Sequence, residues 1–549
     1  LPIPTIAVAT DGGVSVIKDD GSIVNIAAGN AYDGVSYIDI SDTYRLLFEQ
    51  DNASYARSVF YIPIPNANRT TSTSDGVITD KVVMKYYAGT GNMGYPNFKG
   101  AGISNAIMLS GDKQALVSDT DLNILSPNFE SPANGMIAHI TSTYNTGFIV
   151  GGPRLAALSD TDATNAVGTE LVTNGTFDTD TSGWTNSRVG TVTVTSGVVR
   201  VTRAGTQDPT LYQAFSTVVG ETYTVSSQHV STTAVSTTRI LAGTGSGTIL
   251  ADSGFTSVAG IKSVTFVATT TTTSIFLICG TSVDGQYAEW DNISVRLLAE
   301  QDRSVNANGL AVHGTITKSA VATGADLVAY SGFSNSNYLE QPYNADLDFG
   351  TGDFSIMGWV KFTATAANEC IIDTRSTGTV EGVLIYKNTS NVIAFQTQNG
   401  SGSSTYGTVG LYNTGWNHFA TVRTSSGTVQ SIYVNGVLDV SATVTARNLT
   451  GTDAPSRIGR TTDNVYPSAG MSASLLRISA TAPSAAQIKT IYEAEKVLFQ
   501  ENAQATLYGT SDAVTALAHD DSTNLLHVGT SSGRSVFQGL RRVDNTTTA

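Results

Sequence analysis

The sequence contains very little cysteine. Only two of its 549 residues are cysteines, Cys279 and Cys370, and they lie far apart in the chain. Neither has a second cysteine or a histidine at the spacing that metal sites use, and a pair this distant does not make a disulfide framework. We therefore expect neither a disulfide-stapled fold nor a zinc site.

Basic charge is also scarce. The chain has 30 Lys and Arg against 45 Asp and Glu, which gives a net charge of −15. Proteins that bind nucleic acid need a basic stripe, so this balance argues against such a partner and against adhesion to anionic lipid. The longest apolar runs, such as residues 274–279, have only the length of a strand, and we predict no membrane insertion.

Glycine, threonine, serine and asparagine are abundant. β-Branched residues suit strands, and Gly, Asn and Asp suit the turns between them. A chain of 549 residues is too long for one core, so roughly three to four domains are expected. The composition therefore predicts an all-β protein with several domains.

The two ends of the chain carry similar sequences. Residues 5–17 (TIAVATDGGVSVI) and 525–537 (LLHVGTSSGRSVF) align without a gap. A similar rhythm of short strands and turns recurs at 35–62 and 105–125, in units of about 35–45 residues, which is typical of a β-propeller. We predict a propeller of about five blades whose ring is closed by matching segments from both ends. The alternative is a set of unrelated hairpins in a sandwich.

The repeat is missing from the middle of the chain. We therefore predict an interrupted propeller, with an insertion between a strand that ends near Leu158 and a strand at 505–510. The predicted domains are 1–166 and 500–549 for the propeller, and 167–299 and 300–499 for two inserted β-sandwiches.

The first insert opens with Asn174-Gly175-Thr176-Phe177-Asp178 and Gly183-Trp184, and it closes with the segment 290–295 (WDNISV). These pieces resemble the carbohydrate-binding jelly rolls that occur as accessory modules in glycosidases and in phage tail proteins. The resemblance covers residues 170–298.

This resemblance implies two candidate sites. Its first and last strands often share a structural calcium ion, for which Asp178 and Asp291 are the candidate carboxylates, because calcium prefers oxygen ligands. The alternative is that both residues only end strands and cap turns. Trp184 is the candidate platform for stacking a sugar ring, or else it packs in the core under the end of the barrel.

The second insert resembles the laminin-G/concanavalin-like sandwich. The resemblance is carried by segment 352–356 (GDFSI) before Trp359, by 415–419 (GWNHF), and by the turn Asn435-Gly436. Alternation predicts that Phe354, Ile356, Trp359, Trp416 and Phe419 are core residues.

We interpret His418 as a structural histidine of this domain, with a ligand role as the alternative. After Ser484, the chain has the capping-box partner Gln487 and apolar residues at helical spacing, which predicts a helix that closes the sandwich.

The sequence lacks the motifs of the common catalytic sites. It has no G-x-S-x-G elbow, P-loop or H-E-x-x-H, and no carboxylate pair stands in a recognisable glycosidase motif. We therefore expect that the protein is not an enzyme.

In its modular style, the chain is similar to bacteriophage tail fibres and tail-associated virion proteins. That resemblance implies an extracellular virion protein that displays glycan-binding modules toward host cell-surface glycans. Its partners would be other tail proteins and further copies of itself, since avidity favours a homo-oligomer. The alternatives are a purely architectural tail or capsid protein and a secreted bacterial carbohydrate-binding adhesin or enzyme.

Overall fold

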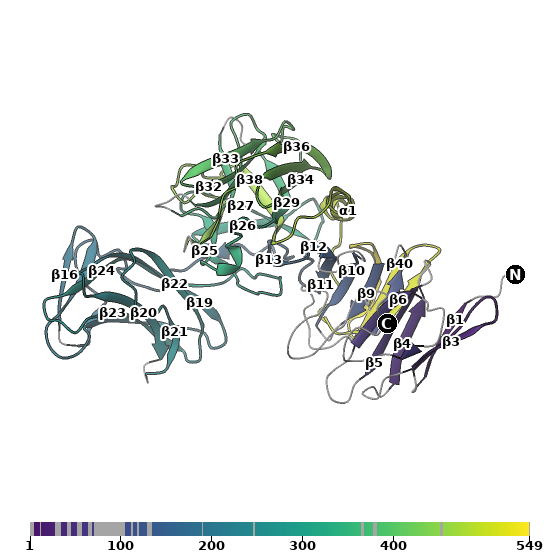
Figure 1. Ribbon diagram of the computed structural model, residues 1–549, viewed down its shortest axis with the longest axis horizontal. Coiled ribbons are helices and arrows are strands. Elements are labelled where there is room, and N and C mark those ends of the chain that lie inside the picture. Colours follow the sequence, from purple (N-terminus) through teal and green to yellow (C-terminus); the bar gives the residue numbers. More distant parts are fainter. Residues whose placement is uncertain are drawn as a thin grey trace.

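In the computed structural model, the β-sheets form three groups that lie next to one another (Figure 1). We call them the base, built by both ends of the chain, the first sandwich (residues 170–298) and the second sandwich (the strands within 153–167 and 311–479). The structure describes residues 5–547 except 11–12, 28–33, 41–44, 52–57, 64–68, 71–104, 111–112, 118–119, 129–133, 189, 245–246, 364–366, 377–380 and 451–453.

The base consists of four sheets with the strand orders β1-β2-β3-β7, β4-β5-β6, β12-β11-β10-β9-β8 and β39-β40-β41-β42. All pairings are antiparallel except that of β3 with β7. Its strands are β1 (Ile6–Thr10), β2 (Gly13–Ile17), β3 (Ile23–Ala27), β4 (Gly34–Ile40), β5 (Arg45–Asp51), β6 (Ser58–Pro63), β7 (Arg69–Thr70), β8 (Asn105–Leu109), β9 (Lys113–Val117), β10 (Leu122–Ser126), β11 (Met136–Ile140), β12 (Ile149–Val150), β39 (Val514–Asp520), β40 (Leu525–Thr530), β41 (Gly533–Gln538) and β42 (Arg541–Thr546).

The matching sequences at the two ends fold into the same hairpin. Thr10 pairs with Gly13 in β1-β2, and Thr530 pairs with Gly533 in β40-β41. The two glycines even share their backbone angle, with φ of 131° and 134°. An L side chain rarely adopts this conformation, so the glycine is what lets the second strand begin directly after the turn.

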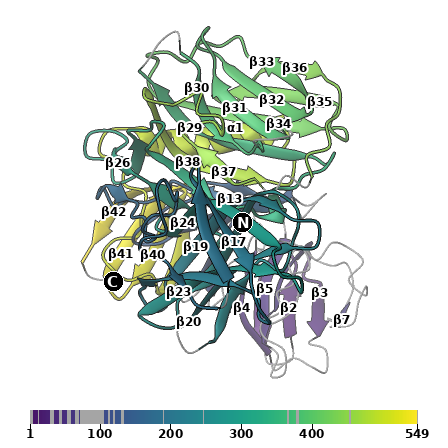
Figure 2. The ribbon, with the colours of Figure 1, turned by 90° about the vertical axis from the view of Figure 1, so that its left-hand side faces the viewer.

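The first strands of the four sheets lie next to one another in a series. β1 contacts β4, β4 contacts β8, and β8 contacts β39, although β39 is separated from β8 by most of the chain. In Figure 2 the N-terminal strands β2–β5 and the C-terminal strands β40–β42 lie below the second sandwich. The contacts among the described strands do not show a closed ring. The predicted number of about five blades also depends on residues 71–104, which lie outside the described residues.

The first sandwich consists of two five-stranded antiparallel sheets, with the orders β15-β18-β23-β20-β21 and β16-β17-β24-β19-β22. Its own core lies between them and includes Phe177, Leu277 and Trp290. The strands are β15 (Thr185–Asn186), β16 (Gly190–Thr195), β17 (Val198–Arg203), β18 (Thr210–Ser216), β19 (Thr222–Thr232), β20 (Thr237–Thr244), β21 (Ile249–Asp252), β22 (Gly260–Val267), β23 (Thr272–Gly280) and β24 (Tyr287–Leu297).

The second sandwich packs a seven-stranded sheet (β25-β28-β37-β30-β31-β32-β33) against a nine-stranded one (β14-β26-β27-β38-β29-β34-β35-β36, with β13 beside β38). Its strands and its short 3-10 turn are β13 (Pro153–Ala157), β14 (Ala166–Val167), β25 (Ala311–His313), β26 (Thr315–Ala320), β27 (Val328–Ser331), β28 (Tyr338–Gln341), η2 (Ala345–Leu347), β29 (Phe354–Phe362), β30 (Glu369–Asp373), β31 (Gly382–Lys387), β32 (Ile393–Asn399), β33 (Ser401–Tyr406), β34 (Asn417–Thr424), β35 (Val429–Val434), β36 (Val437–Thr443), β37 (Ser456–Ile458) and β38 (Met471–Ser479).

Two details correct the predicted boundaries of the base. Strand β13 falls within the segment 1–166 and β14 crosses its end, yet they pair with β38 and β26 of the second sandwich. Residues 505–510 do not form the predicted strand. Their backbone amides bind other groups instead, since Ala505 N donates to the Asp326 carboxylate and Tyr508 N donates to Ser535 Oγ.

The central strands β38, β29 and β34 of the nine-stranded sheet are buried on both faces. In β29, Phe354 and Ile356 point into the core between the two sheets of the second sandwich, as alternation predicts. Met357 and Trp359 point the other way, into a second core shared with the base. A sheet covered on both sides reads as a continuous apolar run, which explains the sequence FSIMGWVKF.

The predicted helix is confirmed as α1 (Ala485–Glu495), which the 3-10 turn η3 (Lys496–Phe499) continues. Ser484 and Gln487 form the capping box, each side chain bonding the other's backbone amide. Ile488 and Ile491 are fully buried in the core that the second sandwich shares with the base. No helix among the described residues is long and apolar enough to cross a membrane.

A buried carboxylate at the end of α1 joins these parts. Glu495 forms an ion pair with Arg477 of β38, and Arg477 Nη2 donates to Glu495 Oε2 at 3.0 Å. Glu495 also accepts from the backbone N of Phe148 at 2.9 Å and from Trp359 Nε1 at 2.8 Å. A Cβ on Gly147 would overlap both charged groups, so the chain passes them only as glycine.

We expect Glu495→Ala to lower the free energy of unfolding by about 3–5 kcal/mol, because it leaves the Arg477 charge buried without a partner. Calorimetric unfolding of the full chain measures this loss. The double variant Arg477→Met/Glu495→Leu should be less destabilised than the single one, since it removes both charges. Equal losses in the single and double variants would contradict the assignment.

His418 is a fully buried structural residue of the second sandwich. Its ring packs edge-on against Trp359, at 5.5 Å between ring centroids, and neither ring nitrogen has a hydrogen-bond partner. Burial, with a smaller contribution from the charge of Arg477, holds the pKa of His418 well below its usual value. The ring is therefore neutral in the folded protein.

This neutral ring predicts a loss of stability in acid. Below pH about 6.5 the unfolded chain takes up a proton at His418 that the folded chain does not, which costs about 1.4 kcal/mol per pH unit until the folded pKa is reached. Melting temperatures measured from pH 7.5 to 5 should therefore fall more steeply for the wild type than for His418→Leu. Parallel curves would refute this role for His418.

Candidate functional site

The outer face of the sheet β15-β18-β23-β20-β21 carries a groove with a cavity volume of about 360 Å³. This size falls within the range of small-molecule sites. The groove lies on the first sandwich, and in Figure 1 the strands β20, β21 and β23 that form it lie in the left-hand group.

The floor of the groove comes from the register of the sheet. Leu241 and Phe276 line the groove and pair with each other, and Tyr212 pairs with Phe276, so the three side chains form a row across β20, β23 and β18 that continues beyond the groove. The rings of Tyr212 and Phe276 stack at 5.6 Å between centroids. Their neighbours Leu211 and Leu277 point the opposite way, into the core.

An apolar row is unusual here, because the uncovered face of an antiparallel sheet is ordinarily polar. Two further apolar side chains extend it into solvent, Ile249 with 54% and Phe255 with 49% exposure. Phe255 lies over Gly280, where any Cβ would overlap its ring. Contiguous exposed apolar surface is common at binding sites, which makes this face a candidate.

Charged groups form the rim. Arg239 lies over the Phe255 ring at 4.8 Å and donates from Nε to Asp252 Oδ1 at 2.8 Å. The hydrogen bond from Arg239 lowers the pKa of Asp252, and the bond to Asp252 raises the pKa of Arg239, so both stay charged near neutral pH. Asp208 and the exposed Arg188 stand elsewhere along the groove.

This combination suits a sugar. The flat aromatic face of Phe255 matches the C–H face of a pyranose ring, and the fixed carboxylate and guanidinium groups can hydrogen-bond its hydroxyls. An apolar surface with a few placed polar groups is the common composition of a ligand site.

Trp184, the predicted sugar platform, is not in the groove, and the structure corrects this prediction. The Trp184 side chain belongs to the core of the first sandwich and the residue is only 8% exposed. Its Nε1 donates to the backbone oxygens of Thr173 and Asn174, both at 3.1 Å, and its ring packs against Phe177. A ring held in this way has no face free for a ligand, so the alternative of core packing holds.

The predicted calcium ligands Asp178 and Asp291 lie near each other, at the first loop and on β24. Burial raises the pKa of Asp291, and the negative charge of Asp178 raises it further. A cation between them would relieve this repulsion. The described residues contain no group of three or more His, Cys, Asp or Glu side chains arranged for a metal ion, so backbone and hydroxyl oxygens would have to complete the six to eight ligands that calcium takes.

The sequence interpretation missed Arg239, Asp252, Phe255 and Phe276. One feature could have identified part of this set: residues 275–279 (IFLIC) are apolar at every position, which predicts that both faces of this strand contact other groups although only one of them belongs to the core of the sandwich.

Comparison with known families supports the assignment of the second sandwich. Residues 333–489 match the family model of the concanavalin A-like lectin/glucanases superfamily. This confirms the predicted laminin-G/concanavalin-like fold for that part of the chain. A search of curated proteins found no match.

Among solved structures, the chain is similar to the binding domain of Paraclostridial Mosquitocidal Protein 1 (11% identity, TM-score 0.31, 43% of this chain and 61% of the other). Another is a structure of botulinum neurotoxin type C, a toxin whose cell entry depends on interaction with two ganglioside molecules (16% identity, TM-score 0.30, 43% of this chain and 58% of the other). A third is the Ruminococcus gnavus IT-sialidase CBM40 bound to α2,3-sialyllactose (10% identity, TM-score 0.23, 26% of this chain and 84% of the other). The chain spans about three-fifths of the length of the two toxin structures, and all three likenesses are distant.

Proposed function

We propose that the protein is a glycan-binding adhesion protein and that the groove of the first sandwich holds a sugar. The observation that carries this proposal is the outward-facing row of Tyr212, Phe276 and Leu241, continued by the exposed ring of Phe255. The lectin-type family match of the second sandwich supports it. Binding takes place without cleavage of the glycan.

In the same proposal, the base is a β-propeller that carries the two sandwiches. The contacts of β1 with β4, β4 with β8, and β8 with β39 support it, because the first strands of neighbouring blades line the axis of a propeller. The hairpins at the two ends of the chain, which have the same register, also support the propeller.

The setting we propose is extracellular, on a phage tail that faces host cell-surface glycans. It rests on the modular resemblance of the sequence. Several copies held with other tail proteins would give weak sugar sites a useful avidity. Detection of the chain in purified virions by mass spectrometry tests this setting, and its absence from them would favour a secreted bacterial adhesin.

The first test is a glycan panel with the full chain, assayed in parallel for released reducing ends. We expect binding without release. Phe255→Ala should weaken binding about tenfold, since aromatic contacts contribute up to about 1.5 kcal/mol beyond area burial. Val258→Ala, at an exposed apolar position outside the groove, is the control.

Release of reducing ends would replace the binding proposal with an enzyme. No binding to any glycan would favour the architectural role.

Calcium is proposed as a structural ion at Asp178 and Asp291. We expect millimolar calcium to raise the melting temperature of the wild type, and EDTA to reverse this. In Asp178→Asn/Asp291→Asn, calcium should have no effect, and the apo protein should be at least as stable as the wild type because the repulsion is gone. An equal calcium response in both proteins would place the ion elsewhere.

A further inference from the structure

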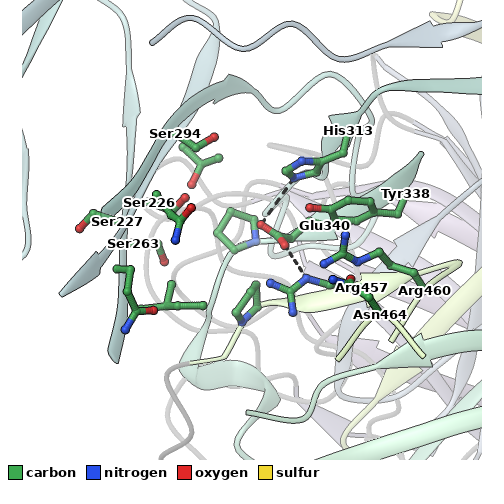
Figure 3. A pocket seen from close by; sticks show the side chains of 16 residues that line it. Ser226, Ser227, Ser263, Ser294, His313, Tyr338, Glu340, Arg457, Arg460 and Asn464 are labelled. Carbon is green, nitrogen blue, oxygen red and sulfur yellow. Dashed lines mark hydrogen bonds and ion pairs between the residues drawn. The ribbon is translucent and has the colours of Figure 1, made fainter. Parts of the chain in front are cut away.

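A second cavity, of about 420 Å³, lies between the two sandwiches (Figure 3). One wall comes from the first sandwich, from β19, β22 and β24. The other comes from the second sandwich, from β25, β28, β37 and the segment that follows β37. Nothing in the sequence interpretation pointed to this place.

The wall from the first sandwich is a row of small hydroxyls. Ser226 pairs with Ser263 on one side and with Ser294 on the other, so the three serines stand in register across the sheet. Nearby, the hydroxyls of Thr224 and Ser227 are buried without a hydrogen-bond partner. Buried hydroxyls without partners are costly, so they favour a polar occupant.

The facing wall is charged. Glu340 accepts from Arg457 Nε at 2.8 Å and lies 3.6 Å from His313 Nε2. Burial would raise the pKa of Glu340, but the neighbouring His313 and the hydrogen-bonded, charged Arg457 outweigh it and lower that pKa to about 2. Glu340 is therefore ionised, and its negative charge balances the positive charge of Arg457.

The second arginine keeps its charge unbalanced. Arg460 lies over the Tyr338 ring at 4.1 Å, and its Nη1 donates to the backbone oxygen of Asn335. No described carboxylate lies within ion-pair distance of it. Arg460 Nε and Arg457 Nη1 are both buried without a hydrogen-bond partner, and Arg457 as a whole is only 7% exposed.

The cavity therefore holds one positive charge more than negative, in a chain whose net charge is −15. Guanidinium groups match planar carboxylates with paired hydrogen bonds. We propose that this cavity binds the carboxylate of an acidic sugar, with Arg460 and Arg457 on the carboxylate and the hydroxyls of Ser226 and Ser263 on the sugar hydroxyls, while Ser294 donates to Glu170. This proposal rests on glycan binding as the function and names the glycan class at a second site.

The test uses pairs of probes that differ only in the acid, with the full chain in isothermal titration calorimetry. The pairs are 3′-sialyllactose with lactose, and trigalacturonic acid with its methyl ester. We expect the acidic member of at least one pair to bind about 10- to 100-fold more tightly, the range for a charge-assisted hydrogen bond.

Arg460→Gln should abolish this preference while it leaves the Arg457–Glu340 pair in place. Arg534→Gln makes the same charge change in the base and should leave the preference intact. Ser226→Leu fills the cavity from the opposite wall without a change of charge, and it should also abolish binding of the acidic probe.

Three results would overturn the proposal: equal binding of acidic and neutral probes, a preference that survives in both cavity variants, or inorganic phosphate binding as tightly as the acidic sugar. The last would show a simple anion site. Failure of the proposed function looks different, because then no probe or glycan of the panel binds and Phe255→Ala changes nothing.

Discussion

The buried carboxylate of Glu495 is the constraint on which the arrangement of the base and the second sandwich depends. Its oxygens are bonded by a strand of the sandwich through Arg477, by β29 through Trp359 and by the base through the amide of Phe148. A buried charge is tolerated only when its partners are fixed, so these segments have to keep their relative positions. The second sandwich is consequently not a module on a flexible linker, since one face of its larger sheet forms part of the core of the base.

The first sandwich is attached differently. It has a core of its own, and its link to the second sandwich includes the contact of β24 with β25 and the hydrogen bond from Arg296 Nη1 to Val312 O. Ser294 and Arg296 of β24 both bind the Glu170 carboxylate, which ties the start of the domain to its last strand. The structure therefore combines a rigid block of base and second sandwich with a first sandwich that carries the groove and contributes one wall of the cavity between the sandwiches.

Features that depend on neighbouring residues could be predicted from the sequence. The hairpin at 525–537, the capping box of Ser484 and Gln487, and the burial of Phe354 and Ile356 all follow from local pattern. Features that depend on distant partners could not. The pairing of β13 with β38 joins residues more than three hundred positions apart, and no local pattern specifies it.

The candidate sites show the same limit. Whether Trp184 or Phe255 is available to a ligand depends on which face of a sheet is covered, and period-two alternation does not say which face that is. Trp184 was the natural choice from sequence, but its indole N–H finds two backbone oxygens in the core. The charged wall of the inter-sandwich cavity was invisible because Glu340 and Arg457 meet only through the pairing of β28 with β37.

Charge acts on this cavity at two ranges. Over distances beyond about 8 Å, physiological salt screens charges, so the overall −15 of the chain repels an acidic glycan mainly at low ionic strength. Within the cavity, Arg457 is buried and Arg460 is half-buried, so salt screens them less than it screens the exposed charges. Moderate salt therefore removes more of the repulsion than of the attraction, and an extracellular ionic strength suits the capture of an acidic sugar by an acidic protein.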